Sequence, residues 1–146
     1  MHILVINGPN LNLLGHREVE VYGNATYDAL ELFLHAEAKK LNVALTIHQT
    51  NYEGAVLDLL HHAEAQGFDG VVLNAAAYSH YSYAIQDGVK AIALPVVNVH
   101  LTDPAARQET FRHTDVLEAV CVATVKGKGF ASYADALSLL VKDVIR

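Results

Sequence analysis

The apolar positions of the chain fall into five short runs that are separated by longer segments with helical spacing. The first run, Ile3 to Ile6, is a continuous leucine and β-branched stretch, which is typical of a strand buried on both faces of a parallel sheet. The other runs cover 43–48, 70–74, 95–100 and 119–125. Because each run is short and bounded by turn residues, we expect five strands.

The segments between these runs place their apolar residues on one face of a helix. We expect helices from Thr26 to Leu41, from Gly54 to Gly67, from Tyr81 to Ile92, and after Gly129. This alternation predicts an α/β fold: a flavodoxin-like, doubly wound, five-stranded parallel sheet with strand order 2-1-3-4-5. With no repeat and no linker, residues 1–146 are expected to form a single domain.

Two polar segments interrupt the pattern. Leu11 to Gly23 has no helical or strand period and is long for a connection in a compact domain, so we interpret it as a lid over a ligand site. Leu101 to Asp115 contains Pro104 and is expected to hold at most a helical turn. Both segments follow predicted strands.

Composition narrows the function classes. A formal charge of −6 without basic clusters argues against nucleic acid or anionic membranes as partners. No apolar run approaches the ~20 residues of a membrane span, and the start lacks a signal peptide. Cys121 is the only cysteine, so no intrachain disulfide is possible. We therefore expect a cytoplasmic protein.

Polar side chains follow the carboxyl ends of the predicted strands, which meet at one edge of a parallel sheet, where α/β proteins bind ligands. They include a candidate base, candidate acids, cations and neutral donors: Asn10, Asn12, Arg17, Tyr22, Asn51, Glu53, Asn74, Tyr78, His80, His100, Thr102 and Arg112. Taken singly, Asn10 could merely form a turn, and His80 or His100 could be hydrogen-bonded structural residues.

Several chemistries can be set aside. The turn after Ile6 is not a phosphate-binding loop, and no serine lies in a nucleophile elbow. Although the chain has nine histidines, His80 and His100 lack a clear third ligand, and the adjacent His61 and His62 point in different directions. We expect no metal site.

The motifs along nearly the whole chain resemble those of the type II 3-dehydroquinases (3-dehydroquinate dehydratases). The resemblance rests on Ile-Asn-Gly-Pro-Asn-Leu-Asn-Leu-Leu-Gly at 6–15, Arg17-Glu18 with Tyr22-Gly23, Gln-Thr-Asn-Tyr-Glu-Gly at 49–54, Asn74, Ala-Tyr-Ser-His at 77–80, Val-His-Leu at 99–101, Ala106-Arg107 and Phe-Arg-His at 111–113. The first motif is long and specific.

The resemblance implies dehydration of 3-dehydroquinate to 3-dehydroshikimate through an enolate, without metal, cofactor or Schiff base. By analogy Tyr22, ionised with help from Arg17, takes the C2 proton, and Asn12 holds a water on the enolate oxygen. His100, oriented by Asn10, protonates the departing C1 hydroxyl. The substrate carboxylate and ring hydroxyls would be bound by the backbone of Leu101 and Thr102 and by the side chains of Asn74, His80 and Arg112.

The resemblance also implies a homo-oligomer, commonly a dodecamer of trimers, in which Asp87 reaches a neighbouring subunit's site. It places the reaction in the shikimate or quinate pathway. It leaves open whether the role is aromatic amino acid biosynthesis or quinate catabolism.

Three departures from the family pattern keep a second interpretation open. Ala75-Ala76 replaces the usual Pro-Gly, and Asn98 stands where a glutamate usually accompanies the acid His100. The segment 103–111 is one residue longer, which leaves the position of Arg107 open. We expect the Asn98 amide oxygen to accept the ring N–H of His100. The alternative to an enzyme is a non-catalytic flavodoxin-like module that binds a related cyclic carboxylic acid.

Overall fold

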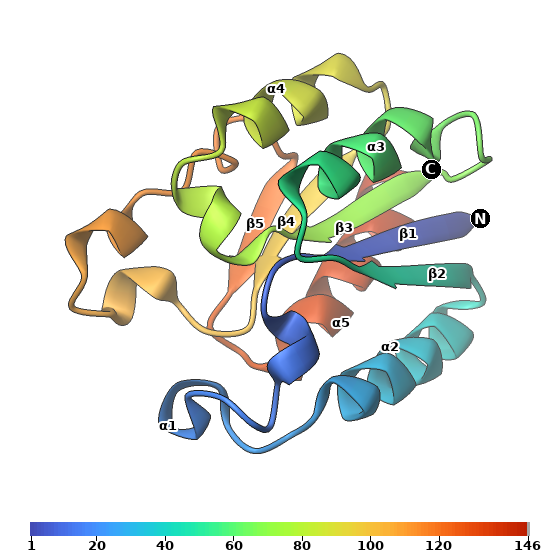
Figure 1. Cartoon of the computed structure of the whole chain (residues 1–146). Coiled ribbons are helices and arrows are strands. Elements are labelled where there is room, and N and C mark those ends of the chain that lie inside the picture. Colours follow the sequence, from blue (N-terminus) through green and yellow to red (C-terminus); the bar gives the residue numbers. More distant parts are fainter. Residues whose placement is uncertain (146) are drawn as a thin grey trace.

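The computed structural model describes residues 1–145 and contains one five-stranded sheet in which all strands are parallel. The strands are β1 (His2–Asn7), β2 (Ala44–Gln49), β3 (Gly70–Asn74), β4 (Val96–His100) and β5 (Ala123–Lys126). Their order across the sheet is β2-β1-β3-β4-β5, which confirms the predicted topology. β1 therefore lies inside the sheet, between β2 and β3 (Figure 1).

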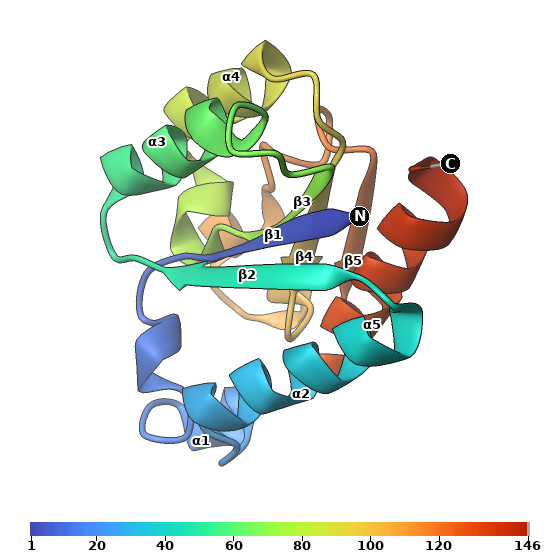
Figure 2. The same cartoon turned by 90° about the vertical axis from the view of Figure 1, so that its right-hand side faces the viewer.

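Helices cover both faces of the sheet. α2 (Tyr27–Leu41) and α5 (Phe130–Leu139) lie on one face, and α3 (Glu53–Ala63) and α4 (Tyr83–Ala91) lie on the other (Figures 1 and 2). A single-turn helix, α1 (Val19–Tyr22), lies beyond the end of the sheet. None of the helices in the described chain is long and apolar enough to cross a membrane.

Alternation along β1 divides the core into two layers. Ile3 and Val5 pack with the helix residues of α2 and α5, whereas Leu4 and Ile6 pack with those of α3 and α4. All four side chains are at most 1% exposed. Burying one such side chain contributes roughly 1.5–3 kcal/mol, so β1 ties the two layers together and fixes the position of the turn that follows it.

Gly8 lets that turn pass close to β3. Its N–H donates to the carbonyl oxygen of Asn74 at 2.7 Å, and a Cβ at position 8 would lie 2.8 Å from the carbonyl oxygen of Ala75. Only glycine fits so near to fixed backbone. The close approach brings the segment after β1 and the segment after β3 to the same side of the sheet edge.

We expect Gly8→Ala to lower the free energy of unfolding by about 2 kcal/mol, because the added methyl group overpacks against backbone that cannot move aside. Gly54→Ala is the matched control: its Cβ would meet nothing within 4 Å on α3. That variant should be neutral or slightly stabilising. Urea unfolding of both variants tests this, and equal midpoints for the two would contradict it.

Two predicted segments differ from the structure. The apolar run 119–125 was expected to be a strand throughout, but 116–122 forms turns and β5 begins only at Ala123. Within the run, Val120 and Cys121 are partly buried against the core layer of α3 and α4, whereas Val122 is 54% exposed, so these residues pack only in part and form no strand. Leu11 to Gly23 was expected to be irregular, but it contains a 3-10 helix at Leu11–Leu13 and the helix α1.

Candidate active site

The carboxyl ends of β1, β3 and β4 surround one cavity of about 140 Å³. Nine of the predicted site residues line it: Asn10, Arg17, Tyr22, Asn74, His80, His100, Leu101, Thr102 and Arg112. Asn12 and Asp87, to which the family resemblance gave a role, do not line it, and neither do the sheet-edge candidates Asn51, Glu53 and Tyr78. Asn12 lies beside Gln49, with 3.5 Å between its Oδ1 and Gln49 Nε2, and Asp87 is an exposed residue of α4 that pairs with Lys90 at 3.1 Å.

Tyr22 reaches the cavity from α1, and its nearest cation is a residue that sequence reasoning did not place. Arg107 Nη1 lies 3.3 Å from the Tyr22 hydroxyl oxygen, while Nη2 lies 2.8 Å from Glu18 Oε1. Arg107 comes from the polar segment after β4, immediately after the 3-10 helix Pro104–Ala106. The contact therefore joins two segments that lie 85 residues apart in the chain.

Arg17 also lies beside Tyr22, but it approaches the ring instead of the hydroxyl. Its guanidinium carbon is 5.3 Å from the ring centroid, and its Nη2 pairs with Glu18. The hydrogen bond from Arg17, with a second from Arg107, holds the pKa of Glu18 below its usual value despite partial burial. Glu18 is therefore a carboxylate that fixes both guanidinium groups around the tyrosine.

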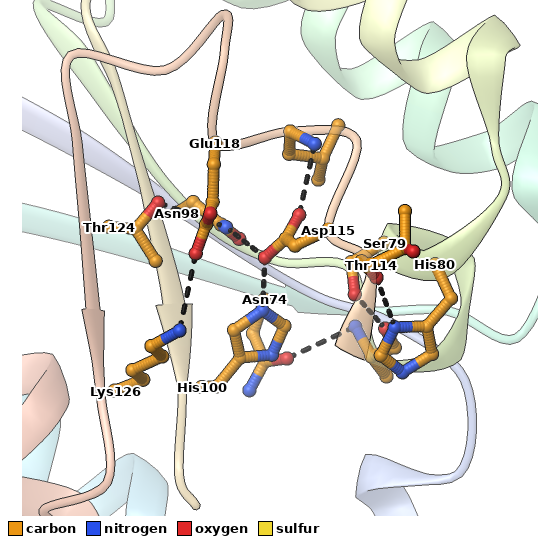
Figure 3. Close-up of polar contacts among 12 residues, drawn as sticks. Asn74, Ser79, His80, Asn98, His100, Thr114, Asp115, Glu118, Thr124 and Lys126 are labelled. Carbon is orange, nitrogen blue, oxygen red and sulfur yellow. Dashed lines mark hydrogen bonds and ion pairs between the residues drawn. The ribbon is translucent and has the colours of Figure 1, made fainter. Parts of the chain in front are cut away.

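On β4, His100 is hydrogen-bonded to a carboxylate that was not among the predicted site residues. Its Nε2 lies 2.8 Å from Asp115 Oδ2, and Asn98 Nδ2 donates to the same oxygen at 2.7 Å (Figure 3). The expected hydrogen bond from His100 to the Asn98 amide oxygen is wrong, because the amide nitrogen of Asn98 faces Asp115 and its oxygen has no partner. Within the described residues, no hydrogen bond joins Asn10 to His100; the N–H of Asn10 donates to Asn51 Oδ1.

Burial opposes ionisation of Asp115, but its hydrogen bond with His100 and the positive charge of that imidazole outweigh it. Together with hydrogen bonds from Asn98 and the Leu117 N–H, they hold the pKa of Asp115 below its usual value. The nearby thiol of Cys121 behaves oppositely: burial, followed by the Asp115 charge, raises its pKa to about 12. Cys121 therefore stays a neutral thiol, and Asp115 stays a carboxylate.

The loop after β3 holds the other side of the cavity. His80 Nδ1 donates to the carbonyl oxygen of Thr114 at 2.8 Å (Figure 3). His80 also lines the cavity, so its second nitrogen, Nε2, is the one left for a ligand. Asn74 donates to the Tyr133 hydroxyl at 2.8 Å and accepts from the N–H of Ala76 at 3.1 Å. Ala76 has φ of 51°, a left-handed conformation that strains a residue with a Cβ. Ala76, from the Ala75-Ala76 pair that departs from the family pattern, thus lines the cavity on strained backbone.

Three guanidinium groups, from Arg17, Arg107 and Arg112, line a cavity in a chain whose formal charge is −6. Arg112 comes from the 3-10 helix Thr110–His113; its guanidinium carbon lies 4.8 Å from the Phe111 ring centroid and its Nε lies 3.4 Å from Glu109 Oε1. Such a cluster attracts an anion in spite of the overall charge. Within residues 1–145, no three His, Cys, Asp or Glu side chains gather closely enough to hold a metal ion.

The chain resembles known proteins along nearly its whole length. The family model described as dehydroquinase class II matches residues 1–141. The chain belongs to this family. A 3-dehydroquinate dehydratase of Bacillus licheniformis is 50% identical over 137 residues, which cover 94% of this chain and 93% of that protein.

Solved structures of dehydroquinases agree with the fold. The type II dehydroquinase of Butyrivibrio crossotus superposes with a TM-score of 0.93 at 42% identity, covering 96% of this chain and 97% of the other. A 3-dehydroquinate dehydratase-like protein of Bifidobacterium longum gives a TM-score of 0.71 at 28% identity, covering 97% and 95%. Family membership confirms the resemblance on which the site residues were predicted. Nothing in these matches favours the non-catalytic alternative.

Proposed function

We propose that the chain is a hydro-lyase that dehydrates 3-dehydroquinate to 3-dehydroshikimate. The observation that carries the proposal is one cavity that holds Tyr22 beside Arg107 and also holds His100, paired with Asp115, among three arginines. A tyrosine that can ionise and a histidine that can be protonated supply a base and an acid. The arginines suit the carboxylate of the substrate and the negative charge that develops in the reaction.

On the base side, the Tyr22 phenolate removes a proton from C2 of the substrate, and the electron pair moves onto the ketone oxygen as an enolate. Arg107, at 3.3 Å, stabilises the phenolate directly, and Arg17 adds charge above the ring. Asn12 acts on the enolate oxygen through a water molecule, since its side chain lies outside the lining of the cavity. Stabilising an oxyanion in this way lowers the barrier to its formation.

On the acid side, the enolate collapses, the bond from C1 to its hydroxyl breaks, and His100 supplies the proton with which the hydroxyl leaves as water. Tyr22 has gained one proton and His100 has lost one, so a proton transfer resets the pair. Leu101 and Thr102, through backbone N–H groups, and the side chains of Asn74, His80 and Arg112 hold the substrate; all five residues line the cavity. Asn10 also borders the cavity, beside the bound ring.

The active form in this proposal is a homo-oligomer, a dodecamer built from trimers, in which Asp87 approaches the cavity of a neighbouring subunit. Asp87 is exposed on α4, away from its own cavity, and the neighbouring Tyr81 and Tyr83 are 58% and 67% exposed. Exposed aromatic side chains of this kind are common in protein interfaces.

The direct test mixes the purified protein with 3-dehydroquinate and follows the ultraviolet absorbance of the conjugated enone product. We expect the absorbance to rise without added metal or cofactor and after treatment with a chelator. No rise under these conditions would contradict the proposed function.

Borohydride should leave the activity unchanged when substrate is present. No lysine lines the cavity in the described part of the chain, so no amine is placed to form an imine with the ketone. Borohydride traps an imine as a stable adduct, which mass spectrometry would detect as added mass on a lysine peptide. Inactivation together with such an adduct would contradict the enolate route.

A further inference from the structure

Asp115 reaches His100 from outside the sheet. It follows the 3-10 helix Thr110–His113, whereas His100 is the last residue of β4. The two side chains are only 11% and 7% exposed, and 2.8 Å separates Asp115 Oδ2 from His100 Nε2. At this burial water competes weakly for the pair, so the contact orients the imidazole more firmly than a surface ion pair would.

Two further hydrogen bonds fix the Asp115 carboxylate. The N–H of Leu117 donates to Oδ1 at 2.9 Å, and Asn98 Nδ2 donates to Oδ2 at 2.7 Å. Asn98 is fully buried, and the same nitrogen also lies 3.3 Å from Thr124 Oγ1 on β5 (Figure 3). The amide thus holds the carboxylate oxygen that His100 contacts, and among the described residues no hydrogen bond joins the amide to the ring itself.

The geometry dictates which ring nitrogen remains available. An ionised carboxylate can only accept, so His100 Nε2 carries the hydrogen in this pair. Nδ1 is then the nitrogen left for the cavity that His100 lines. Oδ2 can accept the Nε2 hydrogen whether the ring is neutral or protonated, so the contact also persists in the form that an acid needs.

We propose that Asp115 is the positioning residue of the acid: held by Asn98 and Leu117, it orients His100 so that Nδ1 delivers the proton to the departing hydroxyl. This inference rests on the function proposed above and adds a residue to it. Asp115 acts through His100 and does not line the cavity.

Other charged or titratable groups surround the pair. Cys121 is a neutral thiol near Asp115, and Lys126, level with His100 on β5, pairs with Glu118 at 3.3 Å and with Asp103 at 3.6 Å. The remaining groups are His80 and the cavity residues Arg17, Tyr22, Arg107 and Arg112. Within the described residues, Asp115 is the one charged group in hydrogen-bond contact with the His100 ring.

The principal test is Asp115→Asn. The amide keeps an oxygen for the Leu117 N–H, but it removes the negative charge and presents an N–H donor to Nε2. Nε2 must then accept, so the hydrogen of the neutral ring moves to Nδ1, the wrong nitrogen. We expect kcat to fall roughly 10- to 100-fold, within the contribution of a positioned acid, while KM changes little. The alkaline limb of the kcat profile should move to lower pH. An unchanged kcat and an unchanged limb would overturn the proposal.

A double-mutant cycle separates positioning from structural damage. If Asp115 acts through His100, then Asp115→Asn should cost almost nothing further in a His100→Asn background. An equal loss in both backgrounds would overturn the proposal. Position 98 offers a rescue, because residues 98 and 100 leave β4 on the same face. Asn98→Glu combined with Asp115→Asn should move the alkaline limb back toward that of the parent; a limb unchanged from Asp115→Asn would count against the charge effect.

A measurement on the unaltered protein reports the tautomer itself and uses a variant only to assign the signal. Nitrogen chemical shifts of ¹⁵N-histidine, with His100 assigned from the spectrum of His100→Asn, report the tautomer of the neutral ring. We expect hydrogen on Nε2; hydrogen on Nδ1 would overturn the inference. Because no substrate is present, this result is independent of the dehydration assay, in which failure of the parent protein would instead overturn the proposed function.

Discussion

Tyr22→Phe should abolish turnover while leaving the fold and ligand binding almost unchanged. The variant loses only the hydroxyl oxygen that lies 3.3 Å from Arg107. Without it the cavity loses the base proposed for the C2 proton, so we expect kcat to fall by at least about 10³-fold, near the upper end of what a general base contributes. KM or the dissociation constant of a substrate-like cyclic acid should change by much less, because the ring still fills its place.

Steady-state kinetics and calorimetric binding measure the two quantities separately. Tyr52→Phe is the matched control, because that tyrosine is 76% exposed and does not line the cavity. It should leave kcat unchanged. If Tyr22→Phe retained a tenth of the parent's kcat, another group would be the base.

Arg107→Gln should be the more damaging of the two arginine substitutions beside Tyr22. The Arg107 guanidinium contacts the hydroxyl oxygen that must carry negative charge, whereas Arg17 lies 5.3 Å from the ring centroid. We expect Arg107→Gln to lower kcat by roughly 10²-fold, as removal of one stabilising donor from a developing anion does, and Arg17→Gln to cost less. Arg107→Lys, which keeps the charge and loses the planar fork, should fall between the parent and Arg107→Gln.

Comparing kcat for Arg107→Gln and Arg17→Gln at the same pH decides the order. The family resemblance implied that the activating charge comes from Arg17 alone. A larger loss in Arg17→Gln than in Arg107→Gln would support that assignment and contradict the role proposed here for Arg107. A loss confined to KM in Arg107→Gln would mean that Arg107 binds the substrate and does not stabilise the phenolate.

Most of the fold could be predicted because its signals are local. The apolar run Ile3–Ile6 is buried on both faces, and Thr26 begins α2 by accepting a hydrogen bond from the Ala29 N–H at 3.2 Å. The start of β5 could not be read in this way. An apolar run does not distinguish a strand from partly buried turns, and the turns here begin where Asp115 Oδ1 accepts from the Leu117 N–H at 2.9 Å.

Most residues of the site could be predicted from strand ends and motifs, whereas the contacts between them could not. Tyr22 meets Arg107 across 85 positions, and His100 meets Asp115 across 15. Both partners come from the segment after β4, whose path depends on tertiary packing and not on any periodic pattern. The Ala106-Arg107 and Phe-Arg-His motifs and the predicted roles of Leu101 and Thr102 indicated that this segment reaches the site, but not which residues it would pair with.

The central claim is that Tyr22 removes the C2 proton to form an enolate and that His100 then protonates the departing hydroxyl. Hydrogen exchange at C2 tests this claim most directly. 3-Dehydroquinate is incubated in D₂O with Tyr22→Phe or with His100→Asn, and the recovered substrate is examined by proton NMR. We expect His100→Asn to replace a C2 hydrogen with deuterium while forming product slowly, and Tyr22→Phe to do neither. Exchange by Tyr22→Phe, or its absence from His100→Asn when the parent exchanges, would contradict this division of labour.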